Sequence, residues 1–448
     1  MHRTMLRIGG CFVLLSATAL WSQTEQTEAA PAAQDGMVST AADDRMLTPP
    51  PVSGESYPTA GTAETRSNYL RGGLTFNSAY SDNVLGGEIP VSDISYSVWP
   101  SLALDESTPR LHLVTTYSPG FTFYQPSSAL NEVDNTASVD YEMRLAEHAM
   151  LTATDSFQDS SSPFSPGIDN TVSGLPVSST PGVTPPFAKR LTNYANVELT
   201  AQPGLNMLVG ALGQASVLDF PNPAQTTGLY DFYSSGGTVF CDWQLPPTQI
   251  FGISYQYLDM VSSPTGLTST TEAETISGNY TFRFNQKLSM SVSGGPQYYK
   301  TVEWPLPTTS AWGTSWATSM GWQGTRTSFA ASYSQGVTGG GGLLGAYHSR
   351  SANAMARWQM ARSWTASAYG AYSINKSVSP LLITSVTSGH SVSGGATLDR
   401  TFGQQFSVDF HYDHVHQSYN DIVAIATNPD SDRETISVTW HFQRPMGR

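Results

Sequence analysis

The sequence predicts an all-β fold: a single transmembrane, antiparallel, up-and-down β-barrel of about 18 strands, within a range of about 16–18. Three observations predict it. Apolar residues recur at every second position from about residue 67 to Phe442, the connections between these segments alternate between short and long, and aromatic residues gather near both kinds of connection. An N-terminal segment without this periodicity precedes the barrel and is expected to be disordered.

The composition agrees with a membrane barrel. Charged residues make up 12% of the 448 residues, roughly half the usual share in soluble domains. Beyond the N-terminus, no run of roughly 18 consecutive apolar residues occurs, which excludes helical membrane spans. Only helices and closed barrels satisfy every backbone hydrogen-bonding group in lipid. If the chain crosses a membrane, it therefore does so as a barrel.

The N-terminus has the three parts of a secretory signal peptide. His2, Arg3 and Arg7 precede an apolar run from Ile8 to Leu20, and small residues follow up to Ser22. This order of basic, apolar and small residues predicts a cleaved signal peptide over residues 1–22, and hence export.

The next segment, residues 23–66, is rich in Ala, Thr, Glu, Asp and Pro and lacks periodicity. Such a composition cannot bury enough apolar surface to offset the entropy lost on ordering, so it predicts a low-complexity periplasmic linker. The alternative is a tail that folds back to plug the barrel. Residues 67–442 are expected to form the barrel, and residues 443–448 a short C-terminal tail.

The strands show apolar and polar faces. In one segment Tyr280, Phe282 and Phe284 alternate with Asn279 and Thr281. Side chains on a strand point to opposite faces in turn, so such segments place apolar residues against lipid and polar residues in the lumen. Repetition of this weak signal along the whole chain is what identifies a barrel.

The connections divide into two classes. Short, turn-rich joints are expected near residues 107–109, 146–148, 203–205, 246–247, 285–286, 323–324, 361–362 and 403–404. Longer connections are expected at 158–189, 219–229, 261–272, 302–311, 336–345 and 419–432. Transmembrane barrels have short turns on one side and longer loops on the other, and an even number of strands places both chain ends on the same side.

The aromatic residues sort with the connections. The residues Trp243, Trp322, Trp358, Trp364 and Trp440 lie near short turns or the C-terminus, whereas Tyr80, Phe157, Tyr257, Tyr298, Tyr333 and Tyr372 lie toward the long loops. Amphipathic rings prefer the membrane–water interface, so two aromatic girdles are expected.

The last strand carries a resemblance to a known class. Its alternating residues Ile436, Val438, Trp440 and Phe442 resemble the C-terminal recognition strand of bacterial outer-membrane β-barrels, which closes on an aromatic residue. The resemblance implies a porin-like barrel in the outer membrane of a Gram-negative-type bacterium, inserted by the barrel-assembly machinery, with outer-membrane lipid around it and homo-oligomers as a possibility. Residues Gln443 to Arg448 depart from the pattern, because they continue past the terminal aromatic.

No sequence motif indicates catalysis or a cofactor. There is no H-E-x-x-H, G-x-S-x-G or P-loop motif, and Cys241 is the only cysteine after the signal peptide. The net charge of −14 argues against nucleic-acid partners. The chain is therefore expected not to be an enzyme.

A histidine group near the C-terminus is the densest set of candidate metal ligands. His411, His414 and His416 lie beside Asp409 and Asp413, and His414 and His416 share a strand face. Because that face continues the apolar residues before it, we expect solvated strand-end histidines above the outer girdle rather than a metal site. The run from Gly339 to Gly342 is interpreted as a flexible outer loop, with a ligand-contacting tip as the alternative.

Strand parity predicts the charged residues that line the lumen. These channel-lining candidates are Arg71, Asp140, Glu142, Arg144, Glu198, Asp242, Arg283, Arg326, Arg357, Asp399 and Asp409. Charged rings in a narrow aqueous pore orient solutes and set selectivity, although some of these groups are also placed to pair across strands. The near balance of signs predicts at most a weak cation preference.

The expected function is a porin-like channel for passive diffusion of small hydrophilic solutes, since a barrel of about 16–18 strands leaves an aqueous lumen. The long connection from Gln158 to Lys189 is a candidate constriction. One alternative is a polysaccharide-export barrel, which would need a lumen of one charge sign or with aromatic platforms. Another is an outer-membrane barrel enzyme or a purely structural barrel.

Overall fold

The computed structural model describes residues 68–446 except 88, 163, 165–186, 223–228, 246–247, 263–267, 286, 305–306, 340–341, 379–387, 404 and 421–429. The expected signal peptide (1–22) and linker (23–66) lie outside the described residues, as does most of the connection from Gln158 to Lys189.

The described chain consists almost entirely of strands. Their bounds are β1 Tyr69–Ser81, β2 Asp93–Ser107, β3 Leu111–Gln125, β4 Glu132–Ala146, β5 Ala149–Ser160, β6 Arg190–Gly204, β7 Met207–Asp219, β8 Phe232–Gln244, β9 Gln249–Ser262, β10 Thr268–Asn285, β11 Leu288–Trp304, β12 Thr309–Gln323, β13 Thr327–Gly339, β14 Ala346–Ala361, β15 Trp364–Ser377, β16 Ser388–Phe402, β17 Phe406–Tyr419 and β18 Asp430–Pro445. One turn of 3₁₀-helix, η2 (Ser128–Leu130), lies between β3 and β4.

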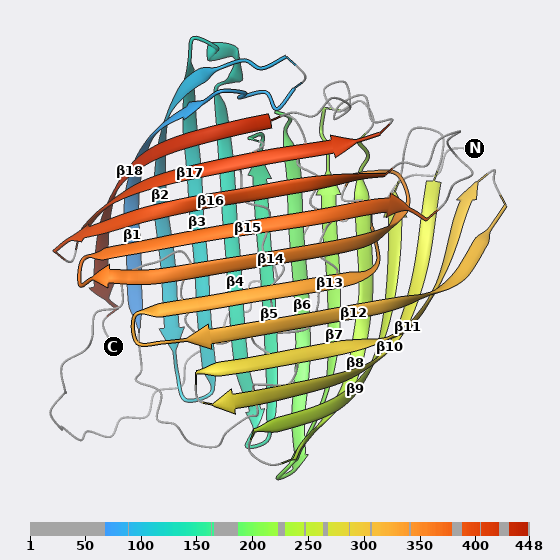
Figure 1. Ribbon diagram of the computed structural model, residues 1–448. Coiled ribbons are helices and arrows are strands. Elements are labelled where there is room, and N and C mark those ends of the chain that lie inside the picture. Colours follow the sequence, from blue (N-terminus) through green and yellow to red (C-terminus); the bar gives the residue numbers. More distant parts are fainter. Residues whose placement is uncertain are drawn as a thin grey trace, which may run out of the picture. The chain divides into compact units, whose positions relative to one another are not determined.

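The strands form one closed sheet. Each strand pairs antiparallel with its neighbours in sequence, and the 18-stranded sheet closes where β1 pairs with β18. This closing register runs from Tyr69 opposite Pro445 to Ser81 opposite Arg433. In Figure 1 the strands follow one another in sequence order around the barrel. The predicted all-β barrel of about 18 strands is confirmed.

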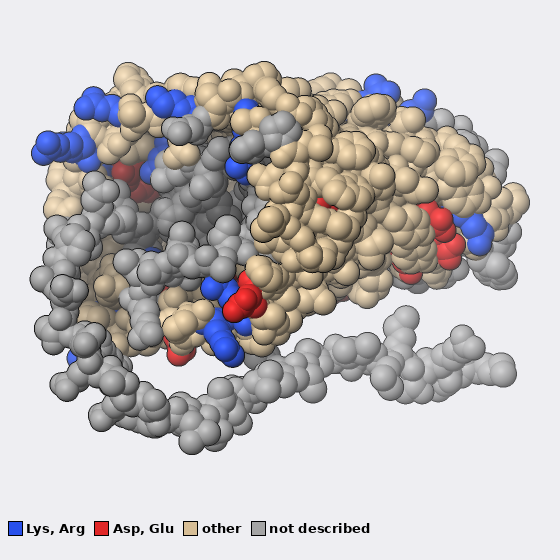
Figure 2. Space-filling view, turned by 90° about the horizontal axis from the view of Figure 1, so that it is seen from below, with Lys and Arg blue, Asp and Glu red and all other residues tan. Residues whose placement is uncertain are grey.

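The alternation in the sequence sets the two faces of the wall. On β8 the odd-numbered Tyr233, Val239 and Trp243 are exposed, whereas the even-numbered Phe232 and Asp242 are buried. The same alternation on the other strands leaves large aromatic and aliphatic side chains exposed on the outer face. Figure 2 shows that charged side chains occupy few positions on the visible barrel surface. Among the described residues, no helix is long and apolar enough to span a membrane.

The inner face packs large rings over glycines. A Cβ on Gly120 of β3 would lie 2.5 Å from the ring of Trp99 on β2, so any side chain at this position would displace the ring. Trp99 also donates a hydrogen bond from Nε1 to Ser97 Oγ (3.1 Å). Glycine here permits close approach of a lumen-facing ring to the wall.

The last strand is longer than the predicted recognition segment. Ile436, Val438, Trp440 and Phe442 all face outward on β18, and the Phe442 ring lies over Gly72 of β1. The strand then continues to Pro445, which pairs with Tyr69. Residues 443–445 therefore take part in closing the barrel.

Candidate functional site in the barrel lumen

At its outer end β13 separates from β12, whereas β14 stays paired with β15 up to Tyr347 opposite Ser377. Pairing between β12 and β13 stops at Trp316 opposite Gln335, whereas β13 and β14 stay paired up to Gly339 opposite Ala346. We call residues Gly336–Ser349 the β13–β14 tip. A Cβ on Gly339 would lie 1.9 Å from the ring of Phe232 on β8, a strand that is not a neighbour of β13. The tip therefore reaches into the lumen.

Hydrogen bonds hold the tip to the inner wall. The Val337 N–H donates to Gln297 Oε1 on β11 (2.8 Å). His348 Nε2 lies 3.3 Å from the hydroxyl of Tyr299, also on β11. On the far side, the Tyr230 N–H donates to the carbonyl of Gly342 (2.7 Å). The tip is thus bound on both of its sides.

Buried apolar side chains surround the tip. This apolar cluster contains Leu218, Phe220, Leu229, Phe232, Leu258, Met260, Ala273, Tyr299, Val337, Leu343, Ala346, Tyr347 and Tyr419, with Val378 packed against it. Its members come from the outer ends of β7–β11 and β17 as well as from the tip. This packed apolar cluster occupies part of the barrel lumen at this level.

The glycines of the tip have specific roles. Gly342 and Gly345 have φ values of +98° and +83°, a region in which residues with a Cβ are strained. A Cβ on Gly345 would also lie 3.1 Å from Glu303 Oε1. Gly339 and Gly342, which the sequence assigned to a flexible outer loop, are buried.

The hydrogen bond from Val337 to Gln297 provides a test of the anchored tip. Gln297→Ala removes the acceptor of a buried backbone N–H, which costs about 1–3 kcal/mol. We expect the tip to detach more often, so that single-channel current fluctuates between a low and a higher level. Gln297→Glu retains an acceptor and is the matched control. Steady current at the original level in both variants would contradict anchoring by Gln297.

Most of the predicted channel-lining residues lie on strand faces turned to the lumen. These are Arg71 on β1, Asp140, Glu142 and Arg144 on β4, Glu198 on β6, Asp242 on β8, Arg283 on β10, Arg357 on β14, Asp399 on β16 and Asp409 on β17. Arg326 lies instead in the turn between β12 and β13. In that turn strand parity does not fix the direction of a side chain.

Several of these groups are paired rather than presented singly. Arg71 forms an ion pair with Asp105 of β2, with Nη2 and Oδ2 3.2 Å apart. Asp242 is fully buried and accepts a hydrogen bond from Asn279 Nδ2 (2.8 Å). Asp399 and Asp409, by contrast, lie directly opposite each other on β16 and β17, which brings two like charges together rather than forming an ion pair. The cross-strand pairing weighed from the sequence thus accounts for part of the lumen charge.

The inner face of β15–β17 holds a connected polar network. Asp413 accepts a hydrogen bond from the hydroxyl of Tyr369 (2.6 Å) and forms an ion pair with His411, whose Nε2 lies 2.7 Å from Oδ2. The other ring nitrogen of His411, Nδ1, lies 2.6 Å from Thr397 Oγ1. This network places a carboxylate and an imidazole beside the aqueous path, and only part of it was expected from the sequence.

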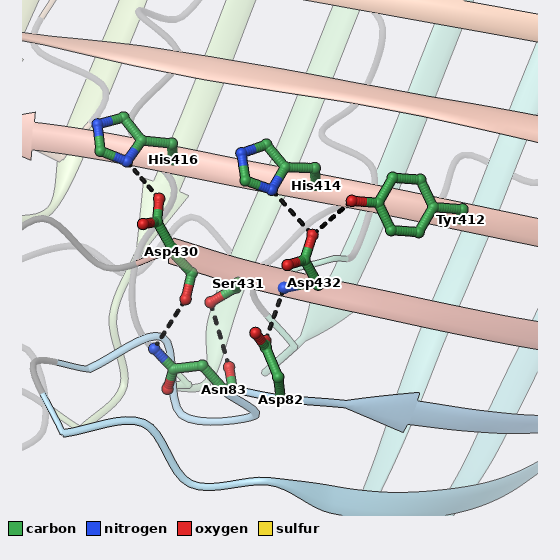
Figure 3. Close-up of polar contacts among 8 residues, drawn as sticks. All are labelled: Asp82, Asn83, Tyr412, His414, His416, Asp430, Ser431 and Asp432. Carbon is green, nitrogen blue, oxygen red and sulfur yellow. Dashed lines mark hydrogen bonds and ion pairs between the residues drawn. The ribbon is translucent and has the colours of Figure 1, made fainter.

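The other two histidines of the group lie on the outer face. Figure 3 shows His414 and His416 of β17 pointing toward β18, where their Nδ1 atoms lie 2.9 Å from Asp432 Oδ1 and 2.5 Å from Asp430 Oδ1. The hydroxyl of Tyr412 also donates to Asp432 Oδ1 (2.6 Å). Within the described ranges, no group of three or more His, Cys, Asp or Glu is arranged to hold a metal ion.

Sequence reasoning missed the lumen charges contributed by strand ends. Glu132 and Asp134 begin β4, Arg190 begins β6, and Arg433 lies near the start of β18. Arg433 donates from Nη1 to Ser162 Oγ (3.4 Å), and its guanidinium lies 5.7 Å from the ring centre of Phe164. Applying the alternation of inward and outward side chains up to the ends of each strand would have identified these residues as lumen-facing.

The chain was compared with known proteins. No family model matches it, and no curated protein matches it. Among solved structures, OccAB4 of Acinetobacter baumannii shows 10% identity and a TM-score of 0.41 over 86% of this chain and 100% of that one. OccK2 of Pseudomonas aeruginosa, solved in complex with glucuronate, shows 10% identity and a TM-score of 0.41 over 83% and 98%. The outer membrane protein OprD of Pseudomonas aeruginosa shows 9% identity and a TM-score of 0.39 over 88% and 98%.

Proposed function

We propose that this chain is an outer-membrane channel through which small hydrophilic solutes diffuse passively. The observation that carries the proposal is the division of the closed wall into an exposed apolar and aromatic outer face and a polar, charged inner face. An apolar exterior suits lipid, and a polar interior suits a water-filled path. The signal peptide expected over residues 1–22 would deliver the chain for export.

The lumen is divided into an apolar side and a charged side. The apolar cluster occupies the outer ends of β7–β11 together with the β13–β14 tip. Charged groups such as Asp413, Arg433 and Asp134 belong to β17, β18 and β4 on the rest of the inner wall. Polar solutes avoid apolar surface, so they would pass along the charged side and be selected there.

The described inner face carries more carboxylates than guanidinium groups. The carboxylates are Asp93, Asp105, Glu132, Asp134, Asp140, Glu142, Glu198, Asp242, Glu303, Asp399, Asp409 and Asp413, and the guanidinium groups are Arg71, Arg144, Arg190, Arg283, Arg357 and Arg433. An acidic lining raises the local concentration of cations. We therefore propose a preference for cations, stronger than the near balance of the sequence-based set implies.

Single-channel recording of the processed protein in a planar bilayer tests the proposal. In a potassium chloride gradient we expect stepwise ionic current with a reversal potential of the sign that cation selectivity gives. Asp413→Asn should reduce this potential, because it removes a lumen carboxylate without changing side-chain size. A correctly folded but silent barrel would contradict the channel function and favour the polysaccharide-export alternative, whereas an anion-selective potential would contradict only the cation preference.

The remaining parts of the proposal concern partners. The outward row Ile436, Val438, Trp440 and Phe442 is proposed as the signal read by the barrel-assembly machinery, because these apolar side chains share one face of the last strand. We propose no catalytic role and no cofactor. Homo-oligomers remain part of the proposal, by analogy of architecture alone.

A further inference from the structure

Three basic side chains gather on the lipid-facing side of the wall, at the outer ends of β14, β15 and β16. Arg350 lies opposite Ile374, and Ile374 lies opposite His390, so these residues form one row across three strands. Lys376 follows Ile374 by two residues and shares its face, and it lies opposite His348, the side chain that contacts Tyr299. Arg350 and Lys376 are therefore diagonal neighbours, a spacing that long side chains bridge easily.

The direction of this row follows from its neighbours. Tyr372 and Ile374 on β15 are 43% and 39% exposed on the outer face, whereas Ser373 and Asn375 between and beside them are buried on the lumen side. Arg350 and Lys376 are themselves exposed. The basic groups thus face away from the aqueous path and cannot serve the passage of solutes.

Arg350 and Lys376 also lack acidic partners. Neither forms an ion pair with any carboxylate in the described part of the chain. Other basic residues at the outer ends of strands are paired: Lys300 Nζ lies 3.8 Å from Glu272 Oε2, and Lys189 Nζ lies 3.1 Å from Asp159 Oδ2. The carboxylate of Asp430 on β18 lies instead against His416 of β17. Among the described residues, no carboxylate forms an ion pair with these two adjacent cations, so they are candidates to bind an external anion.

The position of the row along the barrel indicates which anion Arg350 and Lys376 would bind. The rings of Tyr372, His390 and His416 follow one another across β15–β17, with centroids 6.2 Å and 5.7 Å apart. Of these rings, that of Tyr372 is of the kind enriched at the membrane interface, where lipid headgroups lie. Arg350 is level with this series, and Lys376 lies farther out along its strand. Headgroup phosphates are the anions present at that level.

We propose that Arg350 and Lys376, with His390 beside them, bind a phosphate group on the headgroup of an outer-leaflet glycolipid. The planar guanidinium of Arg350 suits two phosphate oxygens, and the ammonium of Lys376 supplies a second charge from the adjacent strand. The exposed ring of Tyr372 offers a flat surface for the sugar that carries the phosphate. The proposal rests on the proposed outer-membrane location, but does not depend on an open pore.

The test measures binding of fluorescent lipid A, a diphosphorylated glucosamine lipid, to the refolded full-length processed protein in neutral detergent. The double variant Arg350→Gln, Lys376→Gln should bind lipid A about 25-fold more weakly, since each basic residue near a lipid surface accounts for about a fivefold change in affinity. Lys300→Gln is the matched control, because Lys300 also faces outward near a strand end but is paired with Glu272. It should change the affinity by less than about twofold.

The outcomes separate the proposal from simpler explanations. Equal loss in Lys300→Gln and in the double variant would reduce the effect to general surface charge and overturn the site. Competition by millimolar inorganic phosphate as strong as by unlabelled lipid A would overturn the assignment to a lipid. The conductance of these variants should equal that of the wild type. If the wild-type barrel conducts no current but still binds lipid A through this row, the channel function is contradicted and the lipid site is supported.

Discussion

Replacing the β13–β14 tip by a tight turn should raise single-channel conductance about twofold or more, because the replaced segment narrows the aqueous path. In this variant the dipeptide Asn-Gly replaces Gly336–Ser349 and connects Gln335 to Arg350. Gln335 and Arg350 are opposite each other in register, and Asn-Gly favours the turn that a two-residue hairpin requires. The replacement removes Val337, Leu343, Ala346 and Tyr347 from the apolar cluster. It also removes the β14 partners of Asn375–Ser377 at the end of β15, and it leaves the pairing of β14 with β15 from Arg350 onward in place.

The conductance of the variant is measured in a planar bilayer. Folding is checked separately on a gel, where a folded barrel migrates differently before and after heating. The Gln297→Ala variant should show intermediate behaviour, since it loosens the tip without removing it. A folded tip-less barrel with the conductance of the wild type would show that ions pass the cluster without hindrance. In that case the constriction would have to lie elsewhere along the lumen.

Placing a charge on the lipid-facing side should strongly destabilise the barrel. Val239 lies on the outer face of β8 between Tyr233 and Trp243, and its side chain is 54% exposed. We expect Val239→Arg to lower the free energy of unfolding by about 2–4 kcal/mol, because the guanidinium must enter hydrocarbon near the bilayer midplane. Equilibrium urea unfolding in lipid vesicles measures this change.

The matched control places the same residue on the other face. Ala371 lies on β15 at a lumen-facing position, one residue from the exposed Tyr372. Ala371→Arg should change the free energy of unfolding by less than about 1 kcal/mol, since the guanidinium reaches water. Similar losses in both variants would mean that the two faces are not separated into lipid and water. That result would contradict the membrane location itself.

The sequence was enough to predict the barrel, because the two-residue period of a strand is a local property. Alternation at residues such as Phe282 and Thr281 distinguishes the faces, and the turn-rich joints mark where each strand ends. The same parity placed Asp242 and Arg357 on the inner face. The alternation does not apply to Arg326, because this residue lies in a turn rather than in a strand.

The inward course of the tip could not be predicted from the sequence. It depends on contacts between residues far apart in the chain, such as Gly339 with Phe232 and Val337 with Gln297. Locally, the glycine-rich segment has the composition of an outer loop. Only the apolar residues Leu343 and Tyr347 near the glycines signal burial, and no local pattern identifies the partner surface.

The departure of β13 from the wall also limits how deeply the barrel sits in the bilayer. Beyond Trp316, residues Thr309–Ser315 of β12 keep β11 as a partner but have no ladder partner in β13. Seven residues of free strand edge cannot lie in hydrocarbon, where water is absent to hydrogen-bond the open N–H and C=O groups. The upper boundary of the hydrocarbon must therefore lie at or below Trp316. The separation of β13 from β12 thus limits how deeply the whole barrel can sit in the bilayer.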